Sequence, residues 1–153
     1  MSFSGFTDNA VETTVVNDGF WPDFTVGEFQ TLYRIPAEYE AELVADHLRL
    51  AMAWANRQLA GWRTTREAEG MAKLSEVPGD TLGEETLYTL HYRRAVFCHA
   101  KGLLMPQFKT MARRADAKND ALESEETEEK FFQYAEQAVA DFLGRGRINV
   151  ELL

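Results

Sequence analysis

Between Pro36 and Arg63, apolar side chains recur at steps of three and four residues, the spacing of one face of an α-helix. The residues of this stripe are Val44, Leu48, Ala51, Met52, Ala55, Leu59 and Trp62. Pro36 suits the first turn of such a helix, and Glu38 and Glu40 place negative charge where the helix dipole favours it. We therefore expect one long amphipathic helix over residues 37–63.

Two Thr/Glu pairs predict further helix starts. Thr25 and Glu28 have the spacing of a capping box, and apolar residues follow them at helical offsets. Thr81 and Glu84 repeat that spacing before another apolar face. Pro106 should kink or end this later helix, because proline cannot donate the backbone hydrogen bond that the helix needs.

A final helix is expected after the acidic run 123–129, whose charge favours a helix N-terminus, and Gly144 suits its C-terminal cap. The segment 64–80 mixes Gly, Pro and charge and is interpreted as a loop. Period-two alternation is confined to the end of the chain, at residues 147–153.

These segments predict an all-α domain, an irregular four-helix bundle. We expect an N-terminal arm at residues 1–22, the helical bundle at 23–144 and a C-terminal docking tail at 145–153. The predicted core consists of Leu48, Met52, Leu59, Trp62, Val96, Leu103, Phe131 and Phe142.

Composition excludes several classes of protein. The 153 residues suit one domain, and the 45% hydrophobic content argues against global disorder. The net charge of −9 disfavours a dedicated nucleic-acid binder, and a lone Cys98 excludes an internal disulfide and a Cys-rich zinc cluster. Because no stretch approaches the ~18 apolar residues of a membrane span and no signal peptide is visible, we expect a soluble intracellular product with no membrane partner.

Catalytic chemistry has little support. Cys98 and His99 are adjacent, but neighbours on a helix point about 100 degrees apart, so they cannot form a short thiol–imidazole contact. Core packing is the favoured interpretation of Cys98. There is also no phosphate-binding glycine motif. We therefore expect no catalytic residue, no cofactor and no metal.

Two alternatives stay open. The first is a helical-bundle metalloprotein, with candidate ligands His47, His91, His99, Glu42, Asp46, Glu84 and Glu85, although these lack the HExxH and ExxH spacings. The second is a packaging accessory that binds DNA through a basic patch of Arg93, Arg94, Lys101, Lys109, Arg113 and Arg114. The net charge favours pairing of these cations with nearby carboxylates.

The C-terminal tail is the strongest docking candidate. Ile148, Val150, Leu152 and Leu153 follow a Gly-Arg-Gly-Arg break and would be a conspicuous apolar terminus if left in water. Such an extended segment can add a strand to a partner's sheet, or it can fold back on its own bundle. The expected docking residues are Arg147, Ile148, Asn149, Val150, Glu151, Leu152 and Leu153, with Phe20 and Trp21 of the arm as the other candidate contacts.

Four motifs carry a resemblance to a known family: FWPD at 20–23, LAGWR at 59–63, HYRRAVFCHAKGLL at 91–104 and LGRGRINVELL at 143–153. In this order they resemble the phage head completion protein family of temperate contractile-tailed bacteriophages. The resemblance runs from about Phe20 to Leu153, and the acidic linker before the last helix departs from it most.

The resemblance implies a non-enzymatic neck protein of the virion, made in the host cytoplasm during assembly. It implies a ring beneath the portal that joins head to tail and helps retain DNA, with twelve-fold symmetry in the virion and monomers when isolated. The implied partners are the portal, further copies of the chain, a tail terminator or tail-completion protein, and packaged double-stranded DNA that lies in the channel without sequence specificity. An acidic ring would let DNA slide without sticking.

Overall fold

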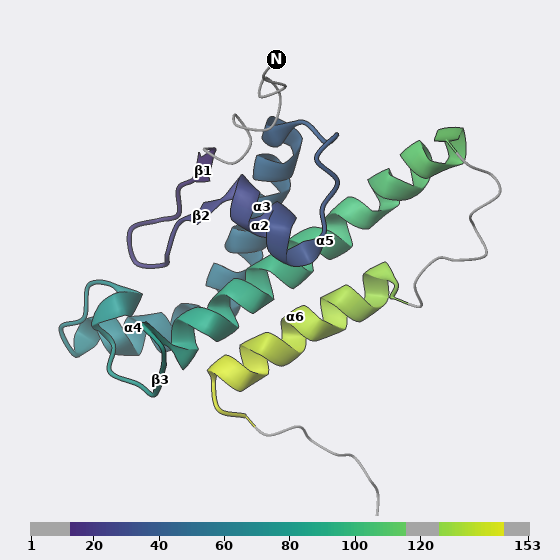
Figure 1. The fold of residues 1–153 in the computed structure, drawn as a ribbon. Helices are drawn as coiled ribbons and strands as arrows, with labels where there is room; N and C mark the ends of the chain where they lie inside the picture. Colours follow the sequence, from purple (N-terminus) through teal and green to yellow (C-terminus); the bar gives the residue numbers. More distant parts are fainter. Residues whose placement is uncertain (1–12, 116–125, 146–153) are drawn as a thin grey trace, which may run out of the picture.

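The computed structural model describes residues 13–115 and 126–145. These residues form five helices, one 3-10 turn and two short antiparallel ladders. Figure 1 shows how these elements are arranged. The elements, in chain order, are β1 (Thr14–Val15), β2 (Phe24–Thr25), α2 (Val26–Tyr33), α3 (Ala41–Gln58), α4 (Ala60–Ala68), the 3-10 turn (Leu74–Glu76), β3 (Thr81–Leu82), β4 (Glu85–Thr86), α5 (Leu87–Ala115) and α6 (Glu128–Phe142). The described chain is mostly helical.

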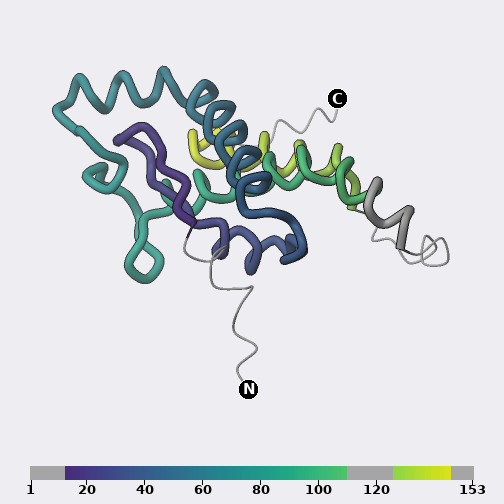
Figure 2. The backbone as a smooth tube through the Cα atoms, turned by 90° about the horizontal axis from the view of Figure 1, so that it is seen from above, coloured from purple at the N-terminus to yellow at the C-terminus, as the bar shows by residue number. Residues whose placement is uncertain are grey.

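Helix α5 organises the molecule. It packs along α6 and is crossed by α3, while α2 covers part of its length (Figure 1). Seen from above in Figure 2, α3 crosses α5 and α6, and α4 leads away from that crossing. The helices are therefore not the four parallel and antiparallel members of a bundle, so that prediction is correct only in its helical content.

The stripe of α3 is buried against α5 as its spacing predicts. Val44, Leu48, Ala51 and Ala55 are inaccessible to solvent. The helix is shorter than expected, because Pro36 begins a turn in which the amide of Tyr39 donates to the carbonyl of Pro36 (3.3 Å). Tyr39 then packs on Phe108, with ring centroids 4.7 Å apart. Helix α3 begins only at Ala41.

The expected single helix 37–63 is broken at Leu59, where φ −105° and ψ 9° separate α3 from α4. Helix α4 then continues to Ala68, so the prediction of a loop over 64–80 is wrong for its first five residues. Within α4 no residue is fully buried, and its half-buried face carries Trp62, Arg63 and Arg66. An apolar stripe alone could not locate this helix, because α4 packs through only one large apolar side chain.

One of the two predicted threonine caps forms. The Thr25 hydroxyl accepts the amide of Glu28 at 3.1 Å and starts α2. Thr81 and Glu84 instead belong to a hairpin in which Thr81 pairs with Thr86, across a turn at Gly83 with φ 65°. The start of α5 is capped by the Thr86 hydroxyl, which accepts the amide of Thr89 at 3.3 Å.

Of the last two helices, α5 differs from the prediction and α6 agrees with it. Helix α5 runs through Pro106 to Ala115, so of the two predicted effects of this proline, a kink or an end, the end is wrong. Helix α6 begins after Thr127, whose hydroxyl accepts the amide of Lys130, and ends before Gly144, which has φ 69°. The left-handed glycine turns the chain away from α6, which confirms the predicted cap.

Candidate functional site

Phe20 and Trp21 lie in the core. Their exposed fractions are 3% and 2%, and the indole of Trp21 stacks on the ring of Tyr92 with centroids 4.6 Å apart. The carbonyl of Phe20 accepts the amide of Leu74 at 3.0 Å. Because neither side chain is accessible in this conformation, their interpretation as arm contacts for a partner is corrected: residues 13–22 are part of the folded body.

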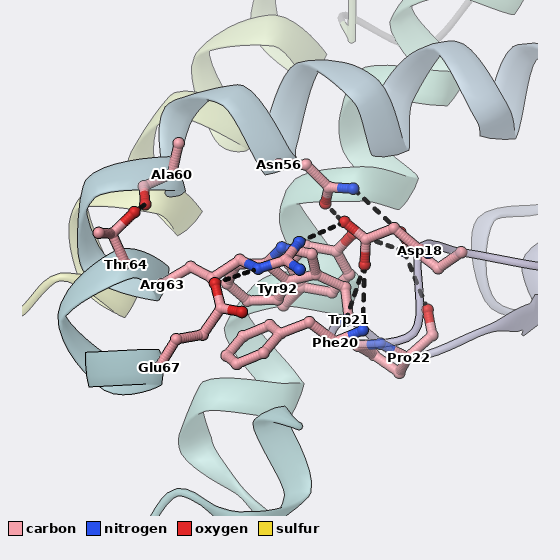
Figure 3. A network of polar contacts seen from close by, with 11 residues as sticks. Asp18, Phe20, Trp21, Pro22, Asn56, Ala60, Arg63, Thr64, Glu67 and Tyr92 are labelled. Carbon is pink, nitrogen blue, oxygen red and sulfur yellow. Dashed lines mark hydrogen bonds and ion pairs between the residues drawn. The ribbon is translucent and has the colours of Figure 1, made fainter. Parts of the chain in front are cut away.

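A closed set of hydrogen bonds holds residues 16–23, the anchored loop, onto two helices (Figure 3). The side-chain Nδ2 of Asn17 donates to the Tyr92 hydroxyl (2.8 Å), which donates to the side-chain Oδ1 of Asn56 (2.6 Å). The Asn56 amide donates back to Asn17 (2.9 Å) and completes the ring. Each side chain of this ring therefore has hydrogen-bond partners, which offset the cost of removing these polar groups from water.

Asp18 holds the same loop in place through hydrogen bonds and an ion pair. Its Oδ1 accepts the amides of Phe20 (3.1 Å) and Trp21 (3.2 Å), while its Oδ2 is paired with Arg63 of α4 (Figure 3). The Arg63 guanidinium also lies 4.8 Å from the centroid of the Phe20 ring. The loop is thereby tied to α4 by charge and to α5 by stacking. Its one sequence signal is the Asp18–Gly19 dipeptide, a turn signal, since Gly19 has φ 94°.

Most residues of the predicted core are buried. Leu48, Met52, Leu59, Val96, Phe131 and Phe142 are each at most 6% exposed. Trp62 and Leu103 are only half-buried, and the neighbouring Leu104 takes the fully buried position on α5. Adjacent residues on a helix point about 100 degrees apart, so Leu104 faces the core while Leu103 lies at its edge.

Cys98 and His99 point to different neighbours. The Cys98 thiol is directed at the Tyr33 hydroxyl (3.7 Å), and burial raises the pKa of this thiol, which disfavours the reactive thiolate. His99 stacks on Trp54 with centroids 4.2 Å apart and planes 7° apart, and burial lowers its pKa. The pair therefore lacks the geometry of a nucleophile and its base.

The candidate metal ligands are not brought together. His47 donates from Nδ1 to the carbonyl of Leu43 (2.8 Å), so its Nε2 accepts from the Gln107 amide (3.2 Å). Glu85 is engaged by Arg93. Within residues 13–115 and 126–145, no group of three His, Cys, Asp or Glu side chains is arranged to hold a metal ion.

The described members of the basic patch have partners inside the chain. Arg93 grips both carboxylate oxygens of Glu85 at 2.8 and 2.6 Å, and this contact raises the pKa of Arg93 and lowers that of Glu85. Lys101 donates to the carbonyl of Tyr33 (2.7 Å). Arg94 lies over the Tyr134 ring, and Lys109 is 3.4 Å from Glu128. The side chains of Arg113 and Arg114 lie outside the described residues.

The predicted docking residues Arg147–Leu153 also lie outside the described residues, but the base of this tail does not. Here α4, the segment before β3, α5 and the end of α6 enclose a groove of about 250 Å³, the root groove. Its apolar wall is a triangle of Trp62, Tyr88 and Phe142 rings, with centroids 4.7 to 5.1 Å apart. Gly144 lines it as well, so the tail leaves the body at the groove itself.

Sequence reasoning missed both the anchored loop and the root groove. Asn17, Asn56 and Tyr92 are separated by 36 to 75 positions in the chain, so no local spacing relates them. The groove could not be predicted for the same reason, because its three aromatic residues come from three helices.

Among the described helices, none is long and apolar enough to span a membrane.

Comparison with known proteins identifies the relatives of this chain. The model of the family described as "Phage head completion protein (GPL)" matches residues 15–153. The "Probable head completion/stabilization protein" of Haemophilus phage HP1 (strain HP1c1) is 28% identical over 151 residues, which cover 99% of each chain. The "Head completion/stabilization protein" of Escherichia phage P2 is 25% identical over 138 residues, covering 89% of this chain and 80% of the relative. No solved structure is significantly similar.

The family match begins at β1 and runs through every described helix to the last residue of the tail. The anchored loop, the root groove and the predicted docking residues all lie within these bounds. The motifs that suggested the resemblance all fall inside it. The chain therefore belongs to the phage head completion protein family.

Proposed function

We propose that this protein is a structural component of the phage neck that forms a ring beneath the portal, joins head to tail and helps retain packaged DNA. The observation that carries the proposal is the extent of the family match, which covers residues 15–153 and therefore both the folded body and the tail. The relatives that align over nearly the whole chain are named for head completion and stabilisation. We place the protein in the virion neck and, during assembly, in the host cytoplasm.

The body is suited to a structural role because its contacts join distant parts of the chain. The anchored loop holds β1 and β2 against α3 and α5, and the amide of Val26 donates to the carbonyl of Thr13 (2.9 Å). Such a body can be added as a rigid unit during stepwise assembly. It needs no catalytic constellation, and the family is one of structural proteins, not of enzymes.

The tail Arg147–Leu153 is the segment proposed to bind the portal or a neighbouring subunit. Helix α6 ends at Phe142, and Gly144 with φ 69° turns the chain out of the helix just before it. The tail then alternates apolar and polar residues. In extended form it can give main-chain hydrogen bonds to a partner's edge and fill pockets with alternate side chains.

The ring proposal fits a heterologous contact, in which one face of each subunit meets a different face of the next. We propose twelve subunits around the portal, and monomers in the isolated protein. A tail terminator or tail-completion protein would then bind the side of the ring that faces away from the portal.

We expect DNA to be confined in the channel without being bound by the protein. The chain carries a net charge of −9. In the described basic patch, Arg93 and Lys109 are paired with Glu85 and Glu128, while Lys101 donates to a backbone carbonyl and Arg94 lies over an aromatic ring. Phosphate binding requires free cations, so this arrangement supports passage and retention over sequence-specific binding.

Electron cryomicroscopy of the neck tests the proposal. Phage lacking the gene for this chain should be complemented with the parent protein, and the map should then show twelve copies in contact with the portal on its tail-facing side. Density for the protein elsewhere in the particle, or filled heads that keep their DNA and join tails without it, would overturn the proposal.

A further inference from the structure

The root groove is too small for a typical small-molecule ligand and is lined mainly by apolar side chains. Its volume of about 250 Å³ lies below the ~300–1,000 Å³ of most ligand pockets. Trp62 and Tyr88 remain half-buried there, although each packs on Phe142. A groove of this size with an aromatic wall fits the aliphatic side chains of a peptide segment.

The nearest such segment is the chain's own tail. The body ends at the groove, because Leu143 and Gly144 both line it. Residues 146–153 follow, and eight residues span at most ~26 Å when fully extended. A segment tethered so closely has an effective concentration in the millimolar range, far above that of a neighbouring subunit in dilute solution.

Charge favours the same occupant. Two exposed carboxylates, Asp80 and Asp141, line the groove, and its described lining residues include neither Lys nor Arg. Arg145 and Arg147 stand at the start of the tail, four and six residues after Asp141. Glu151 comes near the far end of the segment, where it can extend past the groove into water.

We infer that in the free subunit the segment 146–153 folds back into the root groove of its own chain, with Ile148 and Val150 against the aromatic wall. This inference rests on the proposed function, in which the same segment binds the portal during assembly. Folding back keeps the aliphatic terminus out of water until the portal offers a competing site. It also keeps free subunits from joining through their tails before they reach the portal.

Disulfide trapping tests this inference with a matched pair of leucines on α5. Leu87 lines the groove, whereas Leu90, one turn further along, is also half-buried but does not. In a Cys98→Ala background, Leu87→Cys is combined with Val150→Cys, and Leu90→Cys with Val150→Cys as the control. The first pair should form a monomeric, intramolecular disulfide at least about tenfold faster than the control, at a rate independent of protein concentration.

Two outcomes overturn the inference. Disulfide-linked dimers whose yield rises with concentration would mean that the groove takes a neighbour's tail. The experiment is repeated with Leu152→Cys in place of Val150→Cys. Equally slow disulfide formation by the groove pair and the control pair in both experiments would mean that the tail does not enter the groove. Matching thermal melts of the reduced proteins must first show that both variants fold. The proposed function fails separately, if the parent protein does not bind portal although the intramolecular disulfide forms.

Discussion

The indole of Trp21 lies flat on the phenol ring of Tyr92, with centroids 4.6 Å apart and planes 10° apart, while the Tyr92 hydroxyl lies in the hydrogen-bonded ring with Asn17 and Asn56. One side chain of α5 thus holds the N-terminal segment both by stacking and by polar contacts. This relationship explains why residues that look like a polar arm in the sequence belong to the body.

Replacing Trp21 by Ala should cost about 3–5 kcal/mol of unfolding free energy, because a side chain that is 2% exposed leaves a cavity among four aromatic rings. Chemical denaturation followed by circular dichroism measures the loss. Leu82→Ala, at a position that is 62% exposed, serves as the control and should change stability by less than about 0.5 kcal/mol. Similar losses for both variants would show that Trp21 does not hold the core.

Tyr92→Phe should keep the stack on Trp21 and remove only the hydroxyl. The Asn56 oxygen then loses its donor in a partly buried site, at a cost of about 1–3 kcal/mol. Hydrogen exchange should show faster opening of residues 13–24 than in the parent. Tyr88→Phe, a change on the same helix outside the network, should leave exchange there unaltered, and equal effects of the two changes would count against the network.

How much of this the sequence could predict depends on the range of the interaction. The faces of α3 and α6 follow from spacing along one helix, and the caps at Thr25 and Gly144 follow from local chemistry. The break at Leu59, the hairpin at Thr81–Thr86 and the burial of Trp21 depend on partners far along the chain. Spacing cannot reveal such partners, so the helical class was predictable whereas the arrangement and the root groove were not.

Cys98→Ala should leave folding and assembly nearly unchanged, with at most a modest packing loss, because the thiol is a buried core group whose pKa is raised by burial. In the parent protein a thiol reagent should label Cys98 only after denaturant is added. Rapid labelling of the native protein, or loss of assembly by a folded Cys98→Ala variant, would indicate chemistry at this residue.

His99 should make the protein less stable in mild acid. Burial lowers its pKa, so between that lowered value and the ordinary value of about 6.5 the unfolded chain binds a proton that the folded chain does not. Stability therefore falls as the pH drops below about 6.5, and the loss is complete once the pH is below the folded-state pKa. Urea titrations on both sides of this window should show a smaller drop for His99→Phe than for the parent; identical drops would contradict this assignment.

The central claim, that the tail Arg147–Leu153 attaches this protein to the portal, is tested most directly by co-sedimentation with purified portal rings. Burial of three or four aliphatic side chains at about 1.5–3 kcal/mol each, before ordering costs, is multiplied by avidity in a ring. A chain that ends at residue 146, and the Leu152→Asp variant, should both fail to sediment with the portal while keeping the helical circular dichroism spectrum of the parent. Equal sedimentation of parent and truncated protein would contradict the claim and move the contact to the folded body.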